Sequence, residues 1–167
     1  PIIIALDCET ASEARAIVDA TAASVDFYKV GLELYSSNAG MPFVQELIGR
    51  GKKVFLDLKL HDIGETVKRA TAQIAKSGVS LLTVHAEPQV MRAAVAGRGD
   101  SPLKILGVTV LTSLDQADIH EMGYPCSIKE LFDLRVRNAV RAGVDGLVCS
   151  PLEVGEVRKA VGPEMIL

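Results

Sequence analysis

The chain has 167 residues, is 49% hydrophobic and carries a net charge of −3, which fits one soluble globular domain with a sizeable core. The charge has the wrong sign for a protein that attracts nucleic-acid phosphates, and lysines and arginines form no basic run. No apolar stretch reaches the length of about 18 residues that a membrane span needs, and residues 1–6 lack the features of a signal peptide. Three cysteines without metal-ligand spacing are typical of a reduced cytoplasmic protein. We therefore expect a cytoplasmic protein with no nucleic-acid partner and no membrane partner.

Short runs rich in β-branched residues alternate with helical patterns along the chain. The runs predict strands at residues 2–6, 26–30, 53–58, 79–85, 103–111 and 144–149, and residues 164–167 look like the opening of a seventh strand. A first helix should begin at Thr10 or Ser12, with Glu13 behind the cap. Further helices are predicted at residues 41–48, 65–76, 88–95, 127–142 and 151–161, with an irregular stretch before 127.

Alternating strands and helices without a hairpin signal indicate an α/β fold with parallel strands and right-handed crossovers. An open doubly wound sheet and a closed TIM (β/α)8 barrel both fit this order. Residues 6–10, LDCET, contain no glycine, which weakens the interpretation as a dinucleotide-binding fold. Because a barrel needs about 200–250 residues, we expect residues 1–167 to form a single (β/α) barrel domain that is C-terminally incomplete and stops at strand 7.

The third predicted strand ends in ionisable residues, within the segment FLDLKLHDIGET at residues 55–66. Successive side chains of a strand point to opposite faces. In a barrel, Leu56 and Leu58 would face the helices, whereas Phe55, Asp57 and Lys59 would point inward. These charges lie near the carboxyl end of the strand, where barrel enzymes build their active sites.

Three neighbouring strands repeat this pattern, with Asp7 after the first, Lys29 in the second, and Thr83 and His85 in the fourth. The alternative interpretation is that these charged side chains only keep the rim of the barrel solvated and have no function in a site. Converging charges carry a desolvation cost that a core does not require, so the pattern favours a functional site. Lone histidines at such positions are more often structural, so His85 is left out of catalysis, and no spacing of ligand residues predicts a metal.

Several motifs resemble those of orotidine 5′-phosphate decarboxylases. They are ALD at residues 5–7, KVG at 29–31, DLKLHDI at 57–63, TVHA at 83–86 and VTVLTS at 108–113. The likeness runs along the whole chain, and the D-x-K-x-x-D pattern is its most specific element. Sugar-phosphate relatives in the same suprafamily share that pattern, but they carry glutamate where this chain has Lys29 and they lack the histidine at 61.

The resemblance implies cofactor-independent decarboxylation of orotidine 5′-monophosphate to UMP and carbon dioxide in de novo pyrimidine biosynthesis. Lys59 would protonate the ring carbanion, while Asp57 and Asp62 would keep its ammonium charged and aimed. Lys29 would sit beside Asp57 and touch the ribose, and Asp7 would accept hydrogen bonds from ribose hydroxyls.

The resemblance also implies a homodimer, in which Asp62, Ile63 and Thr66 reach into the neighbouring subunit's site. Thr112 would lie near the pyrimidine. The family's phosphate-binding residues follow its seventh and eighth strands, so we expect them beyond Leu167.

Two alternatives stay open on the sequence. One is a sugar-phosphate decarboxylase or aldolase of the same suprafamily, of the 3-keto-gulonate 6-phosphate type. The other is a catalytically inactive barrel that serves as a binding module, against which the intact Asp57, Lys59 and Asp62 set argues.

Overall fold

The computed structural model describes residues 2–167, so Pro1 of the expected domain lies outside the described residues. Six strands alternate with helices. The strands are β1 (Ile4–Leu6), β2 (Phe27–Gly31), β3 (Lys53–Leu60), β4 (Leu81–His85), β5 (Lys104–Val108) and β6 (Gly146–Val148). The helices are α1 (Ala11–Thr21), α2 (Leu32–Ser36), α3 (Gly40–Gly49), α4 (Gly64–Ala75), α5 (Pro88–Arg98), α6 (Gln116–Glu121), α7 (Ile128–Ala142) and α8 (Val154–Val161).

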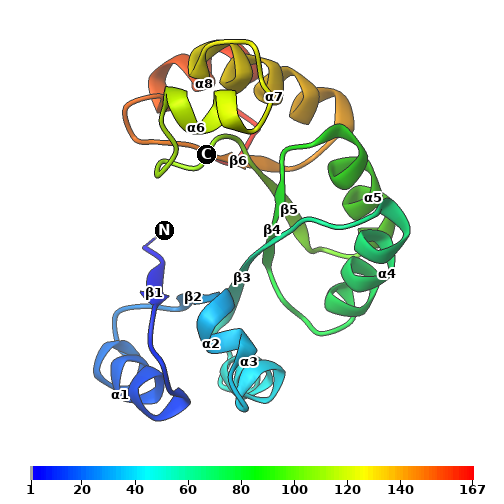
Figure 1. Ribbon diagram of the computed structural model, residues 1–167. Helices are drawn as coiled ribbons and strands as arrows, with labels where there is room; N and C mark the ends of the chain where they lie inside the picture. The colour runs from blue at the N-terminus through cyan, green and yellow to red at the C-terminus, as the bar shows by residue number, and fades with distance from the viewer. Residues whose placement is uncertain (1) are drawn as a thin grey trace.

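The strands form one sheet in the order β1-β2-β3-β4-β5-β6, and every neighbouring pair is parallel. The sheet curves into an arc with the helices along its outer side, and the two chain ends face each other across the open side (Figure 1). Near the end of the chain Ile166 forms a parallel bridge with Gly146. The predicted parallel α/β architecture is therefore confirmed, and the expected seventh strand begins as a single bridge.

Side-chain alternation in β3 follows the predicted pattern. Val54 and Leu56 are fully buried and Leu58 is nearly so, because they pack into the core beneath the helices. Asp57 and Lys59 lie on the opposite, concave face and are only partly covered. This alternation brings polar side chains to the concave face of the sheet while the other face supplies the core.

Helix capping explains where several helices begin and end. Thr10 caps α1 through a reciprocal capping box with Glu13, as one of the two predicted starts required. Ser127 and Glu130 form a second box at the start of α7. Gly143 ends α7 in the left-handed conformation, with φ of 74°, which glycine adopts without steric cost.

The structure differs from the predicted elements in three main respects, besides smaller shifts at other ends, such as β1 beginning at Ile4 and not at residue 2. The short helices α2 and α6 lie where no helix was expected, because five or six residues are too few for a helical period to show in a sequence. Residues 151–153 form a turn, so the last helix begins at Val154 and not at Pro151. The fifth strand ends at Val108 and not at residue 111. Within residues 2–167, no helix combines the length and apolar character that crossing a bilayer requires.

Candidate active site

Four charged side chains from three neighbouring strands form a continuous array on the concave face. The Lys29 ammonium lies 2.9 Å from Asp7 Oδ1 and 3.7 Å from Asp57 Oδ2. The Lys59 ammonium lies 2.8 Å from the same Asp57 oxygen. Charges therefore alternate in sign along the order Asp7, Lys29, Asp57, Lys59. We call these four residues the mouth array.

Asp57 is the carboxylate that both lysines of the mouth array share. Its side chain is 15% exposed, and its second oxygen accepts a hydrogen bond of 2.8 Å from the Thr83 hydroxyl. Burial alone would raise the pKa of Asp57. Hydrogen bonds from Lys59 and Thr83, together with the charges of Lys59 and Lys29, outweigh burial and hold the pKa of this carboxyl below its ordinary value. Asp57 is consequently a carboxylate near neutral pH, and it pairs with the ammonium groups of both Lys29 and Lys59.

The backbone at Lys59 is strained. Its φ is +48°, a value that residues with a side chain rarely adopt. The pairing of β3 with β4 shifts register between Leu56 and Leu60, and the Lys59 N–H donates to the side-chain hydroxyl of Thr83 in β4 at 2.9 Å. Such irregularities re-aim side chains and concentrate at functional sites. Here the Lys59 ammonium pairs with the same Asp57 carboxylate as the Lys29 ammonium does.

A cavity of about 380 Å³ opens over the mouth array. All four members line it, together with His85, which sequence reasoning left out of catalysis, and Glu33, which it missed. The complete lining is Leu6, Asp7, Lys29, Gly31, Leu32, Glu33, Leu34, Asp57, Leu58, Lys59 and His85. Glu33 enters through the unpredicted helix α2, and recognising a helical turn directly after the KVG motif would have found it.

Two histidines flank the cavity. The rings of His61 and His85 lie 4.9 Å apart between centroids, and His61 Nε2 lies 3.1 Å from a Glu87 carboxylate oxygen. Burial, followed by the charges of His61, Arg135 and Lys59, lowers the pKa of His85, and Glu87 opposes them. His85 therefore favours its neutral form beside the mouth array.

Three predicted site residues lie away from this cavity. Asp62 and Ile63 occupy the turn after β3, and Thr66 lies in the first turn of α4. All three are exposed within the single chain. Asp62 Oδ1 accepts a hydrogen bond of 2.6 Å from the Ile63 N–H, and none of the three lines the cavity over the mouth array.

Thr112 lies in a separate depression of about 240 Å³ at the ends of β5 and β6. Its neighbours there include Val110, Ser150 and Glu153. The structure therefore does not bring Thr112 into the cavity that holds the mouth array. Across residues 2–167 no cluster of three or more histidine, cysteine, aspartate or glutamate side chains could hold a metal ion.

Comparison with known proteins gives one family for the whole chain. The family model described as orotidine 5′-phosphate decarboxylase / HUMPS matches residues 1–167. A curated orotidine 5′-phosphate decarboxylase from Caulobacter sp. (strain K31) is 52% identical over 166 residues, which cover 99% of this chain and 72% of that relative. Its counterpart from Caulobacter vibrioides (strain NA1000 / CB15N) is 54% identical over 158 residues, 95% of this chain and 67% of the relative.

Solved structures agree with the sequence comparison. A crystal structure of orotidine 5′-phosphate decarboxylase from Lactobacillus acidophilus superposes with a TM-score of 0.87 at 34% identity, and covers 99% of this chain and 78% of that chain. An uncharacterized conserved protein from Geobacillus kaustophilus superposes with a TM-score of 0.92 at 35% identity, with coverages of 99% and 81%. The fold is thus of the TIM-barrel type found in these decarboxylases, and the chain belongs to the orotidine 5′-phosphate decarboxylase / HUMPS family.

Proposed function

We propose that this chain decarboxylates orotidine 5′-monophosphate to UMP and carbon dioxide, without a cofactor, as a step of pyrimidine biosynthesis. The observation that carries the proposal is the Lys59–Asp57 ion pair of 2.8 Å, which lines the cavity together with Lys29 and Asp7. Relatives about half identical to this chain bear the name of that enzyme, which supports the choice of substrate.

The proposed mechanism depends on the negative charge that develops on the ring carbon of the substrate. The bond between the ring carbon and the carboxylate breaks, carbon dioxide leaves, and the electron pair stays on the ring carbon. The Lys59 ammonium stabilises that pair and then donates a proton to the carbon, forming the C–H bond of the product. Lys59 is left neutral and regains its proton from solvent. Asp57 favours the charged form of Lys59 before each turnover.

The remaining members of the mouth array bind the sugar in this scheme. Asp7 accepts hydrogen bonds from ribose hydroxyls, and its side chain is 65% exposed while it is paired with Lys29. Lys29 donates to the ribose while it stays paired with Asp7 and Asp57. Thr112 contacts the pyrimidine from the rim of the barrel.

We further propose that the protein works as a homodimer. Ile63 is a large hydrophobic residue that is 69% exposed in the single chain, and Asp62 lies beside it in the turn after β3. An isologous dimer would cover this turn and let Asp62, Ile63 and Thr66 complete the partner's site. Asp62 would then stand against the partner's Lys59 as its second carboxylate.

A sugar-phosphate decarboxylase of the same suprafamily is the competing function. Lys29 weighs against it, because those relatives carry glutamate at this position, whereas here an ammonium lies between Asp7 and Asp57. An inactive binding module is the other competitor, and the charged, cavity-lining Lys59 weighs against that.

The test supplies the intact protein with orotidine 5′-monophosphate and, in parallel, with 3-keto-gulonate 6-phosphate. Carbon dioxide and the product are measured with and without a metal chelator. The expected result is stoichiometric carbon dioxide and UMP from orotidine 5′-monophosphate at a rate the chelator leaves unchanged. Turnover of the sugar phosphate alone would establish the competing function, and turnover of neither would leave a binding module.

A further inference from the structure

A buried arginine lies outside the mouth array. Arg135, in the middle of α7, is 7% exposed, and it forms no ion pair with a carboxylate among the residues that the structure describes. Burying a cation without a carboxylate partner is costly unless other groups compensate its charge. The groups that compensate the charge of Arg135 therefore indicate its role.

The Arg135 guanidinium binds two segments at once. One of its amino groups donates to the backbone carbonyl of Thr109. The other lies 3.4 Å from the Tyr124 hydroxyl, and the guanidinium carbon lies 5.8 Å from the centre of the Tyr124 ring. A carbonyl dipole and an aromatic face both favour a cation. The charge is thus compensated by two residues that are far apart in the sequence.

Those two residues bound one loop. Thr109 is the point at which the chain leaves β5, and its own N–H and hydroxyl both donate to the Val148 carbonyl in β6, at 3.3 Å and 2.9 Å. Tyr124 is the point at which the chain returns, shortly before the start of α7. Residues 110–123 lie between them, and we call this segment the rim loop. Thr112 is one of its residues.

We propose that Arg135 is a positioning residue that clamps the two ends of the rim loop and so fixes Thr112 against the bound substrate. The inference rests on the proposed function for the part that concerns substrate. The clamp itself rests on the contacts with Thr109 and Tyr124. A planar guanidinium reaches a carbonyl and an aromatic ring together, which a lysine ammonium cannot do with the same geometry.

The first experiment measures amide hydrogen exchange in the intact protein without substrate. In Arg135→Met, exchange of residues 110–115 should become faster than in wild type, while exchange in β3 stays unchanged, because only the loop loses an anchor. Arg137→Met is the matched control, since Arg137 lies on the exposed face of the same helix. Unchanged exchange in the rim loop of Arg135→Met would overturn the clamp, whatever the substrate of the protein is.

The second experiment asks whether the clamp acts through Thr112. Arg135→Met should raise KM about tenfold and change kcat less than about threefold, because a displaced binding group weakens substrate and transition state alike. In a Thr112→Ala background the same substitution should raise KM by less than about twofold, since contacting residues are not additive. Equal increases in the two backgrounds would show that Arg135 acts only on stability.

Milder variants keep both tests valid if Arg135→Met does not fold. Tyr124→Phe removes one hydroxyl and retains the ring, and Arg135→Lys retains the charge and loses the planar fork. Each should shift loop exchange and KM in the same direction as Arg135→Met, and by less. If wild type turns over no orotidine 5′-monophosphate, the proposed function and the Thr112 step both fail, and the exchange experiment still decides the clamp.

Discussion

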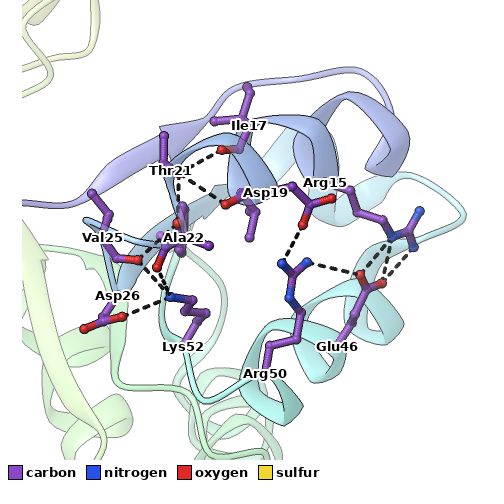
Figure 2. Close-up of polar contacts among 12 residues, drawn as sticks. Arg15, Ile17, Asp19, Thr21, Ala22, Val25, Asp26, Glu46, Arg50 and Lys52 are labelled. Atoms are coloured by element: carbon purple, nitrogen blue, oxygen red, sulfur yellow. Dashed lines mark hydrogen bonds and ion pairs between the residues drawn. The ribbon is translucent and has the colours of Figure 1, made fainter.

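Two groups of charged residues lie at opposite ends of the strands and do different things. One is the mouth array at the carboxyl ends. The other, which we call the base cluster, surrounds the amino ends of β2 and β3 and the space between α1 and α3 (Figure 2). Its members are Arg15, Asp19, Asp26, Glu46, Arg50 and Lys52. Both groups are dense in ion pairs, so the number of charges does not distinguish them.

In the base cluster the charges satisfy one another and the backbone. Arg15 binds Glu46 with two bonds of 2.9 Å, which link α1 to α3. Lys52, with an 11% exposed side chain, donates to the carbonyls of Ala22 and Val25 as well as to Asp26. These bonds stabilise the packing of α1 against α3 and of the chain segments that precede β2 and β3. In this region no residue other than glycine has a positive φ.

In the mouth array two lysines converge on one carboxylate at the edge of a cavity. Lys59 reaches Asp57 from a strained backbone conformation, and its ammonium remains partly open to the space where a ligand would sit. A shared carboxylate, a strained residue and a cavity coincide here and not at the base. In the base cluster Glu46 is also shared, by Arg15 and Arg50. The comparison therefore teaches that a shared carboxylate marks the candidate site where a strained residue and a cavity accompany it.

The largest expected effect comes from removing the ammonium at the mouth. Lys59→Ala should lower single-turnover decarboxylation by more than about a thousandfold, or about 4 kcal/mol of transition-state stabilisation. Arg50→Ala in the base cluster should leave the rate unchanged. Circular dichroism and size-exclusion chromatography check that both variants are folded. A Lys59→Ala rate within about tenfold of wild type would end the assignment of Lys59 as proton donor.

The next effect concerns the choice of substrate. Lys29→Glu should lower activity on orotidine 5′-monophosphate by more than about a hundredfold, because the new carboxylate would face Asp7 and Asp57. Steady-state assays measure it, with Lys29→Met separating loss of the cation from gain of the anion. Near-normal activity of Lys29→Glu would show that Lys29 does not belong to the mouth array.

A third test asks whether Lys59 and Asp62 of different subunits form one site. Lys59→Ala and Asp62→Ala should each be inactive as homodimers. In a mixed dimer one site carries both lesions and the other carries neither, so mixing should restore up to about half of the wild-type activity per mixed dimer. Differently tagged chains allow the mixed species to be purified. Mixed dimers as inactive as their parents would show that Asp62 acts within its own chain.

A fourth test concerns the base cluster and stability. Lys52→Met removes the donor to the Ala22 carbonyl and one of the two donors to the Val25 carbonyl, which also accepts from the Tyr28 hydroxyl. This loss should cost about 1–2 kcal/mol and lower Tm by about 3–6 °C. Turnover at 25 °C should not change. Lys53→Met, one residue further along and exposed, is the control and should leave Tm unaltered. If Lys52→Met lowered turnover and left Tm unchanged, the base cluster would act in catalysis and not in stability, contrary to this account.

The smallest expected effect is on acid stability through His85. Its pKa in the folded chain lies below the ordinary 6.5, so the unfolded chain binds the proton more tightly. The stability it contributes is present above pH 6.5 and is lost as pH falls through the folded pKa. His85→Asn should therefore flatten the acid side of the Tm curve. The exposed His120→Asn serves as control, and an unchanged Tm curve for His85→Asn would refute the shift.

Periodicity was enough to predict the parallel sheet and the inward direction of Asp57 and Lys59, because alternation along a strand fixes both. The positive φ of Lys59 and its bond to Thr83 could not be predicted. They depend on the register shift between β3 and β4, which arises only when two strands pair. Glu33 was missed because α2 is too short to show a period.

Arg135 illustrates a signal that the sequence does carry. The buried residues Leu131, Phe132, Val136 and Ala139 form the apolar stripe of α7, and Arg135 lies on that same stripe. A charged residue in such a position needs a compensating partner. The identity of the partners, Thr109 and Tyr124, could come only from the folded chain, because they lie outside the regular elements, at the two ends of the rim loop.

The most direct test of the mouth array restores its ammonium chemically. Lys59→Cys is made in the intact protein and alkylated with bromoethylamine, which rebuilds a side chain of nearly lysine length. Wild type treated in parallel controls for modification of Cys8, Cys126 and Cys149. Unmodified Lys59→Cys should be inactive, and the aminoethylated protein should regain decarboxylation to within about tenfold of treated wild type. Equal rates for Lys59→Cys before and after alkylation, at a level near wild type, would contradict the role of Lys59.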